Sequence, residues 1–169
     1  MAITFNADEI YNIAEQIERN GQKFYSDSAE RVKESSATKV LQNLADMEAE
    51  HLKTFQALHA KLSEQARDQI TWDPDGQAGA YLQAAADSHV FKTSADPTSL
   101  LKDNTDAREI LELALQFEKD TVIYFLGVAE IVPQRLGKAD VLGLVKQEQG
   151  HISLIQRTLS TLKRLEGKT

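Results

Sequence analysis

The chain contains no cysteine, and this absence removes several chemistries from consideration. Disulfides, thiolate zinc sites, iron–sulfur clusters and thiol catalysis all require cysteine, so none of them can be built from these residues. The absence also fits a reducing compartment, and the first five residues, Met1-Ala-Ile-Thr-Phe5, lack a signal-peptide pattern. No apolar run approaches the roughly eighteen residues of a membrane span. We therefore expect a cytoplasmic protein with no membrane partner.

Chain-breaking residues and basic clusters are also scarce. Eight glycines and three prolines punctuate 169 residues, of which 41% are hydrophobic, so the composition predicts a globular domain with a continuous core. The net charge of −7 argues against nucleic acid as a partner, because nucleic-acid binding requires clustered Lys and Arg, and it favours the approach of cations. Nucleophile elbows and phosphate-binding glycine loops are absent, so nucleophilic catalysis finds no support.

Apolar residues at helical spacing fill most of the chain. They predict four long helices, at about residues 6–33, 37–66, 105–132 and 139–165. Short turns join the first helix to the second and the third to the fourth, whereas a turn-rich, partly helical connection at about 67–104 joins the two pairs. The sequence therefore predicts an all-α four-helix bundle, in which a long crossover connects two helical hairpins. We expect residues 1–169 to form a single domain.

One arrangement of acidic residues and histidines occurs twice. A lone Glu is followed thirty residues later by Glu-x-x-His, and the whole pattern recurs 100 residues further along. The residues are Glu18, Glu48 and His51 in the first half, and Glu118, Glu148 and His151 in the second. Residues three apart lie on nearly the same face of a helix, so each Glu-x-x-His pair can direct two side chains at one point. All six interrupt apolar stripes, where a carboxylate is costly to bury unless it is paired or bound to metal.

The similarity between the two halves extends beyond these six residues. The residues of the first half that recur identically at an offset of 100 include Ala14, Gln16, Glu18, Ala29, Glu30, Val32, Leu44, Glu48, His51 and Gln56. This pattern indicates a duplicated helical hairpin. In each half the three acidic or histidine residues lie about 24 Å from the hairpin turn, so the two sets can meet at one height of the bundle.

Four carboxylates that converge in an apolar core raise one another's pKa and cannot all remain ionised without a countercharge. Two divalent cations would balance them and leave the histidines as neutral ligands. Imidazole with carboxylate suits iron or manganese, and zinc can occupy the same set. The alternative interpretation is a group of salt-bridged glutamates and core histidines, which a duplicated set at matched heights makes the weaker hypothesis.

These segments resemble the rubrerythrin-like branch of the ferritin-like superfamily. The resemblance rests on Glu18-Arg-Asn-Gly-Gln-Lys-Phe-Tyr25, on Glu118-Lys-Asp-Thr-Val-Ile-Tyr-Phe125 and on the two Glu-x-x-His pairs, and it covers all four long helices but not the connection. It implies a ferritin-like bundle that holds two iron ions in a carboxylate-bridged centre. It further implies an oxidoreductase that reacts with peroxide or oxygen, is re-reduced by an external electron donor, and forms a homodimer. By position, each half would serve mainly one iron.

The resemblance also assigns secondary roles and shows two departures. Tyr25 is a candidate catalytic residue that could hydrogen-bond a ligand or supply an electron or proton, although a core tyrosine is the simpler interpretation. Rubrerythrins proper carry a cysteine-rich rubredoxin module, for which this sequence has no cysteines. They also carry an additional ligand Glu where this chain has Leu115, a role that Glu15 could fill from the other half. Two alternative functions stay open: an iron-handling ferroxidase or storage-type protein, and a non-enzymatic metal-binding module.

Overall fold

The computed structural model of the protein describes residues 7–62, 77–88, 96–102 and 105–166. Its helices are α1 (Ala7–Arg31), α2 (Ser35–Ala60), α4 (Gln77–Ser88), α5 (Ala107–Ile131) and α6 (Lys138–Glu166), and it has two short 3-10 helices, η1 (Pro97–Leu100) and η2 (Gln134–Leu136). The ranges that the structure describes contain no β-strand. The predicted all-α class is confirmed, because α1, α2, α5 and α6 correspond to the four predicted long helices.

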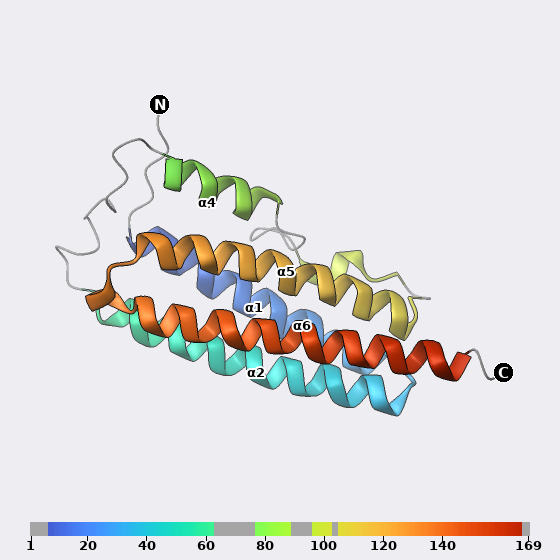
Figure 1. Ribbon diagram of the computed structural model, residues 1–169. Helices are drawn as coiled ribbons and strands as arrows, with labels where there is room; N and C mark the ends of the chain where they lie inside the picture. The colour runs from blue at the N-terminus through green and yellow to red at the C-terminus, as the bar shows by residue number, and fades with distance from the viewer. Residues whose placement is uncertain (1–6, 63–76, 89–95, 103–104, 167–169) are drawn as a thin grey trace.

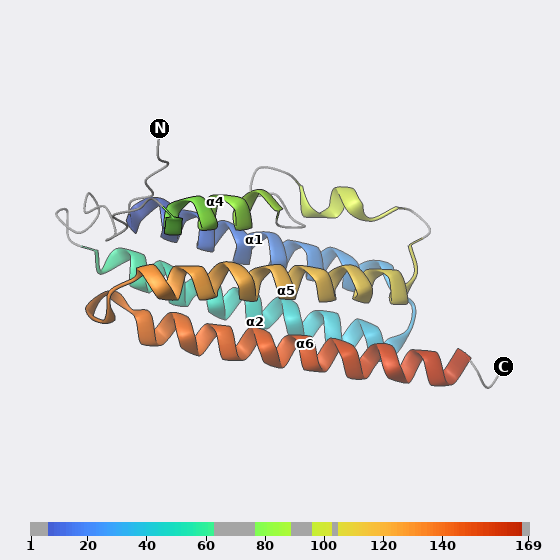
Figure 2. The same cartoon turned by 45° about the horizontal axis from the view of Figure 1, so that its top comes forward.

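The four long helices form two antiparallel hairpins that lie side by side (Figure 1). α1 packs on α2 and α5 packs on α6, while α1 also contacts α5 and α2 contacts α6 across the bundle. Figure 2 shows that α2 ends beside the start of α1, whereas α5 begins at the opposite end of the bundle. The chain between α2 and α5 therefore crosses the length of the bundle, and on the way α4 packs on α5 and η1 packs on α1. The predicted long crossover is confirmed.

The ends of the helices follow from local hydrogen bonding. α5 begins after Asp106, whose carboxylate accepts the backbone N–H of Glu109 while the Glu109 side chain accepts that of Asp106 in return. α6 begins after Gly137, whose φ of 106° is a left-handed conformation that favours glycine. α2 ends earlier than the predicted residue 66, because the backbone N–H of Lys61 bonds the carbonyl of Leu58 and tightens the last turn. Residues 63–66 lie outside the described part of the chain.

Two positions near the middle of the bundle show how the duplicated hairpins fit together. A Cβ added at Gly21 would lie 2.7 Å from Cζ of Phe117, so glycine is what allows the Phe117 ring to lie against α1. The equivalent residues at an offset of 100 reverse the sizes, because Thr121 stands for Gly21 and Ile17 stands for Phe117. This exchange of small and large side chains keeps the core filled although the two hairpins are not identical. Within the described residues, no helix is long and apolar enough to span a bilayer.

Candidate metal centre

The six predicted acidic and histidine side chains come from the middle of the four long helices and are all buried. α1 and α5 each supply one glutamate, whereas α2 and α6 each supply a glutamate and a histidine. The four glutamates are 0% exposed and the two histidines are 2% and 3% exposed. The structure thus brings together all six residues that the repeat singled out, at the height that the helix spacing predicted.

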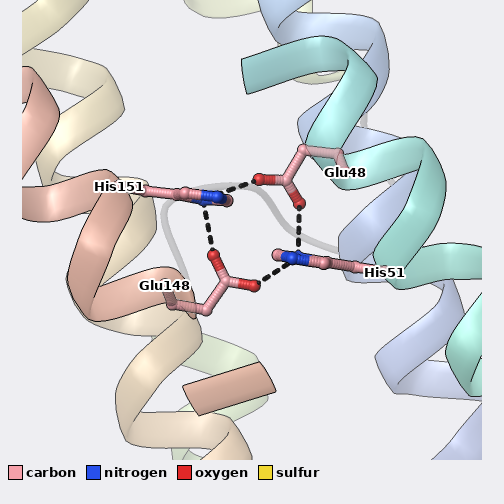
Figure 3. A group of neighbouring side chains, drawn as sticks. All are labelled: Glu48, His51, Glu148 and His151. Carbon is pink, nitrogen blue, oxygen red and sulfur yellow. Dashed lines mark ion pairs between the residues drawn. The ribbon is translucent and has the colours of Figure 1, made fainter. Parts of the chain in front are cut away.

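Glu48 and Glu148 lie between the two histidines (Figure 3). The two carboxylate oxygens of Glu148 are each 2.8 Å from a histidine Nδ1, one from His51 and the other from His151. Glu48 also approaches both imidazoles, with distances of 3.3 Å to Nδ1 of His151 and 4.0 Å to Nδ1 of His51. The imidazole rings themselves are stacked, with centroids 5.2 Å apart and planes inclined by 8°. The donor atoms of these four residues all lie within 4.8 Å of one another, which is close enough to hold a metal ion.

Glu18 and Glu118 occupy the outer positions of the group. Glu18 lies 3.7 Å from Nδ1 of His51, and Glu118 lies 3.3 Å from Nδ1 of His151. Each therefore approaches the histidine of its own half, whereas Glu48 and Glu148 approach both histidines. The arrangement has an approximate two-fold symmetry, with two shared carboxylates at its centre and one unshared carboxylate on each side.

Most polar atoms of the group are buried and lack a hydrogen bond. Both oxygens of Glu18, Glu48 and Glu148 and the Nδ1 atoms of both histidines have no hydrogen-bond partner within the described chain. The short N–O distances therefore reflect convergence on common points rather than N–H groups that point at oxygens. Buried polar atoms without partners are rare because each costs about 1–3 kcal/mol. Carboxylate oxygens and imidazole nitrogens that face one another in this way fit divalent metal ions, which would satisfy their lone pairs.

In the metal-free protein, burial and neighbouring charges shift the pKa values of the clustered carboxylates. Burial, followed by the charge of Glu48, raises the pKa of Glu18 well above its usual range, and burial with the charge of Glu148 does the same for Glu118. Burial alone would also raise the pKa of Glu148, but the two adjacent imidazoles lower it to about 2. Without metal, protons thus balance the charge of the outer carboxylates.

The histidines respond in the opposite sense. Burial acts to lower the pKa of His151, but the carboxylates around it, Glu118 first, raise it to about 12. Burial opposes protonation of His51 as well, yet contact with Glu148 leaves its pKa above the ordinary value of 6.5. The surrounding carboxylates thus favour the protonated form of both imidazoles, and cations at this site would displace those protons.

Two further side chains contact the group from outside. The hydroxyl of Tyr25 donates a hydrogen bond of 2.5 Å to Oε1 of Glu118, across the bundle from its own helix. Burial, with the charge of Glu118 next, raises the pKa of Tyr25 well above its usual range, so the phenol keeps its proton. Nε2 of His51 lies 3.2 Å from Oε1 of Gln147 on α6. Gln147 was not predicted from the spacing of acidic residues and histidines, and only its position beside Glu148 in the sequence hints at this contact.

The predicted extra ligand, Glu15, is engaged elsewhere. Its Oε2 lies 2.7 Å from Nη2 of Arg19, and its Oε1 lies 2.7 Å from Nδ1 of His59. His59 in turn contacts Asp8 through its other ring nitrogen, at 2.8 Å. Glu15 therefore belongs to an ion-pair group at the surface of α1 and α2 and is not among the four residues whose donor atoms converge. Leu115, at the corresponding position of the other half, is a buried core residue.

The fold and the buried Glu/His cluster define the ferritin-like class of helical di-metal proteins. The family model for the ferritin-like domain matches residues 6–161, and the chain belongs to this family. Its fold is similar to that of a Thermotoga maritima protein of known crystal structure, which is described as a proposed ferritin-like diiron-carboxylate protein. The likeness has a TM-score of 0.74 at 17% identity and covers 95% of this chain and 98% of that chain. A search of the curated proteins finds no match.

Proposed function

We propose that this chain is a rubrerythrin-like di-iron oxidoreductase that reduces peroxide or oxygen at the buried Glu/His cluster. The observation that carries this proposal is the position of Glu48 and Glu148, each of which approaches both histidines while its own oxygens lack hydrogen-bond partners in the described chain. Such shared carboxylates are what a pair of adjacent cations requires, because each would bridge both ions.

The six residues divide into two roles when metals are bound. Glu18 with His51 would hold one metal, Glu118 with His151 would hold the other, and Glu48 and Glu148 would contact both. Four carboxylates would then balance two divalent charges in a core from which water is excluded. Two ferrous ions would supply the two electrons that, with two protons, reduce one peroxide molecule to two water molecules.

The chain itself places a hydrogen-bond donor beside the cluster. Tyr25 is 0% exposed and keeps its proton on the oxygen that faces Glu118. The donated hydrogen bond orients the Glu118 carboxylate and holds a proton beside the metal position, where reduction of peroxide consumes protons. We propose an external electron donor, because these 169 residues include no cysteine that could hold an iron–sulfur or rubredoxin-type centre.

Metal analysis combined with a peroxide reaction tests the proposal. Protein loaded anaerobically with ferrous iron should hold about two metal ions per chain, and one equivalent of peroxide should be consumed as the absorption of ferric iron appears. Glu48→Ala together with Glu148→Ala should abolish metal binding, since the shared carboxylates are lost. Glu15→Gln is the matched control, because Glu15 is an acid on α1 that is only 7% exposed and whose partners are Arg19 and His59. Wild-type protein without bound metal after loading would refute the proposal.

The alternative function, an iron-handling ferroxidase or storage protein, would consume ferrous iron as its substrate instead of peroxide. The net charge of −7 would favour delivery of ferrous iron as a substrate. In that case oxygen uptake should scale with added iron beyond two ions per chain, and sedimentation should detect a large assembly that stores the product. Peroxide turnover with a fixed complement of two ions favours the oxidoreductase instead.

A further inference from the structure

The two halves of the repeat surround the Glu/His cluster with different neighbours. At an offset of 100, Tyr25 corresponds to Phe125, and Gln147 corresponds to Met47. Each exchange replaces a side chain that hydrogen-bonds a cluster residue with one that cannot make the same bond: phenylalanine has no hydroxyl to donate, and methionine has no amide oxygen to accept. The six cluster residues are duplicated, but the side chains that support them are not.

The first difference acts on the outer carboxylates. Glu118 accepts the hydroxyl of Tyr25, and both side chains are 0% exposed. Phe125 cannot make the corresponding bond to Glu18, and in the described chain neither oxygen of Glu18 has a hydrogen-bond partner. A hydrogen bond donated to a carboxylate stabilises its charge and makes it less basic. The same bond also holds Glu118 in one orientation, which favours metal binding, so this difference does not by itself favour either half.

The second difference acts on the histidines. An amide oxygen only accepts hydrogen bonds, so the contact with Gln147 places the proton of neutral His51 on Nε2 and leaves Nδ1 free to bind a cation. Nε2 of His151 is buried and has no hydrogen-bond partner among the described residues. Met47, the counterpart of Gln147, offers only a weakly accepting thioether. An acceptor behind a metal-binding histidine fixes its orientation and makes it a stronger ligand.

The difference at the histidines therefore decides between the two halves of the centre. We propose that the two metal positions are unequal, and that the position at Glu18 and His51 binds a divalent cation more tightly and fills before the position at Glu118 and His151. This inference rests on the proposed di-metal function. Loss of a partner behind a metal ligand typically lowers affinity by about 10- to 100-fold. We therefore expect two separate binding steps whose affinities differ by at least about tenfold.

Anaerobic titration of chelator-treated protein with cobalt(II) tests the inequality, with heat and visible absorption as independent signals. Wild-type protein should show a tight step and a weak step. His51→Ala should remove the tight step, and His151→Ala should remove the weak step. The opposite assignment, or a single step of two equal sites, would overturn the inference while leaving the di-metal proposal intact. Absence of cobalt binding would refute both.

Two exchanges between the halves test the cause. Gln147→Met should weaken the tight step by about tenfold and bring the two steps together, whereas Met47→Gln should tighten the weak step. Gln147 is exposed, so its replacement should not prevent folding. Gln149→Met, an exposed glutamine two residues further along α6, is the matched control and should leave both steps unchanged. An equal effect of the two glutamine variants, or none from either, would show that the contact with His51 does not set the difference.

Discussion

Glu18 is the most isolated carboxylate of the cluster, and its replacement by Leu should stabilise the metal-free protein. The side chain is 0% exposed, and neither oxygen has a hydrogen-bond partner within the described chain. Burial without partners costs about 1–3 kcal/mol for such a group. Leucine has no polar atoms and a comparable volume, although it is shorter than glutamate, so Glu18→Leu should raise the free energy of unfolding by about 2 kcal/mol. For a chain of this size the melting temperature should then rise by about 4–8 °C.

Glu118→Leu is the matched comparison, because this carboxylate accepts the hydroxyl of Tyr25. Removing Glu118 leaves a buried phenol without its acceptor, which costs about 1–3 kcal/mol and cancels the gain. The double variant Glu118→Leu with Tyr25→Phe should recover that loss. Urea unfolding of chelator-treated proteins, followed by circular dichroism, measures all three values.

The sign should reverse when metal is present. At a free metal concentration about 100 times the dissociation constant, each site adds about 2.7 kcal/mol to the stability of the wild-type protein. Glu18→Leu forfeits that contribution at its own metal position, so the variant should be more stable without metal and less stable with it. A variant that is destabilised by 1 kcal/mol or more in the absence of metal would refute the argument that Glu18 is a strained ligand without partners. Equal gains for Glu18→Leu and Glu118→Leu would refute the assigned role of Tyr25.

Three further outcomes follow from the structure. Gly150→Ala should stabilise the protein by about 1 kcal/mol, because the added Cβ meets nothing within 4 Å. Gly127→Ala should destabilise the protein, because the added Cβ would lie 2.5 Å from the Tyr81 ring. Urea unfolding should show a gain in stability for the first variant and a loss for the second. Burial acts to lower the pKa of His59, but the contacts with its two carboxylate partners outweigh burial and leave the pKa above 6.5. The contribution of these ion pairs to stability is therefore complete below pH 6.5 and is lost as pH rises through the raised pKa. The difference in unfolding free energy between wild type and His59→Asn should accordingly shrink at higher pH, and a constant difference would contradict this account. Metal binding should release protons at pH 7 and tighten as pH rises, because cations replace the protons that the raised pKa values of the outer carboxylates and histidines retain. Calorimetry in buffers of different ionisation enthalpy should detect this release. Absence of proton release would show that the cluster is already deprotonated.

The helices and the height of the cluster were predictable from sequence because both depend on local geometry. A fixed rise per residue and 3.6 residues per turn convert the spacing of Glu48 and His51, and its repeat 100 residues later, into a position along each helix. The interruption of apolar stripes by acids predicted their burial. The crossover was predictable from the length of the connection, since a short link would have allowed only an antiparallel neighbour.

Contacts between helices were less predictable, because they depend on how far one helix is rotated and shifted against another. Tyr25 lies two turns from Glu18 on the same helix, yet its hydroxyl reaches Glu118 across the bundle. Glu15 has the spacing of an additional ligand, but a neighbouring helix brings His59 to it instead. No periodicity in the sequence distinguishes these outcomes.

The duplicated helical hairpin, with three acidic or histidine residues at one height in each half, could be inferred from residue spacing alone. Residue spacing sets the positions of side chains along a helix, and these positions do not depend on how the helices pack against one another. The packing of the helices was needed to show that Glu48 and Glu148 approach both histidines, and that Gln147 lies behind His51 whereas its counterpart in the repeat is Met47. Packing between the hairpins sets those distances, because the exchange of large and small side chains at Phe117 and Gly21 fixes how closely the helices approach.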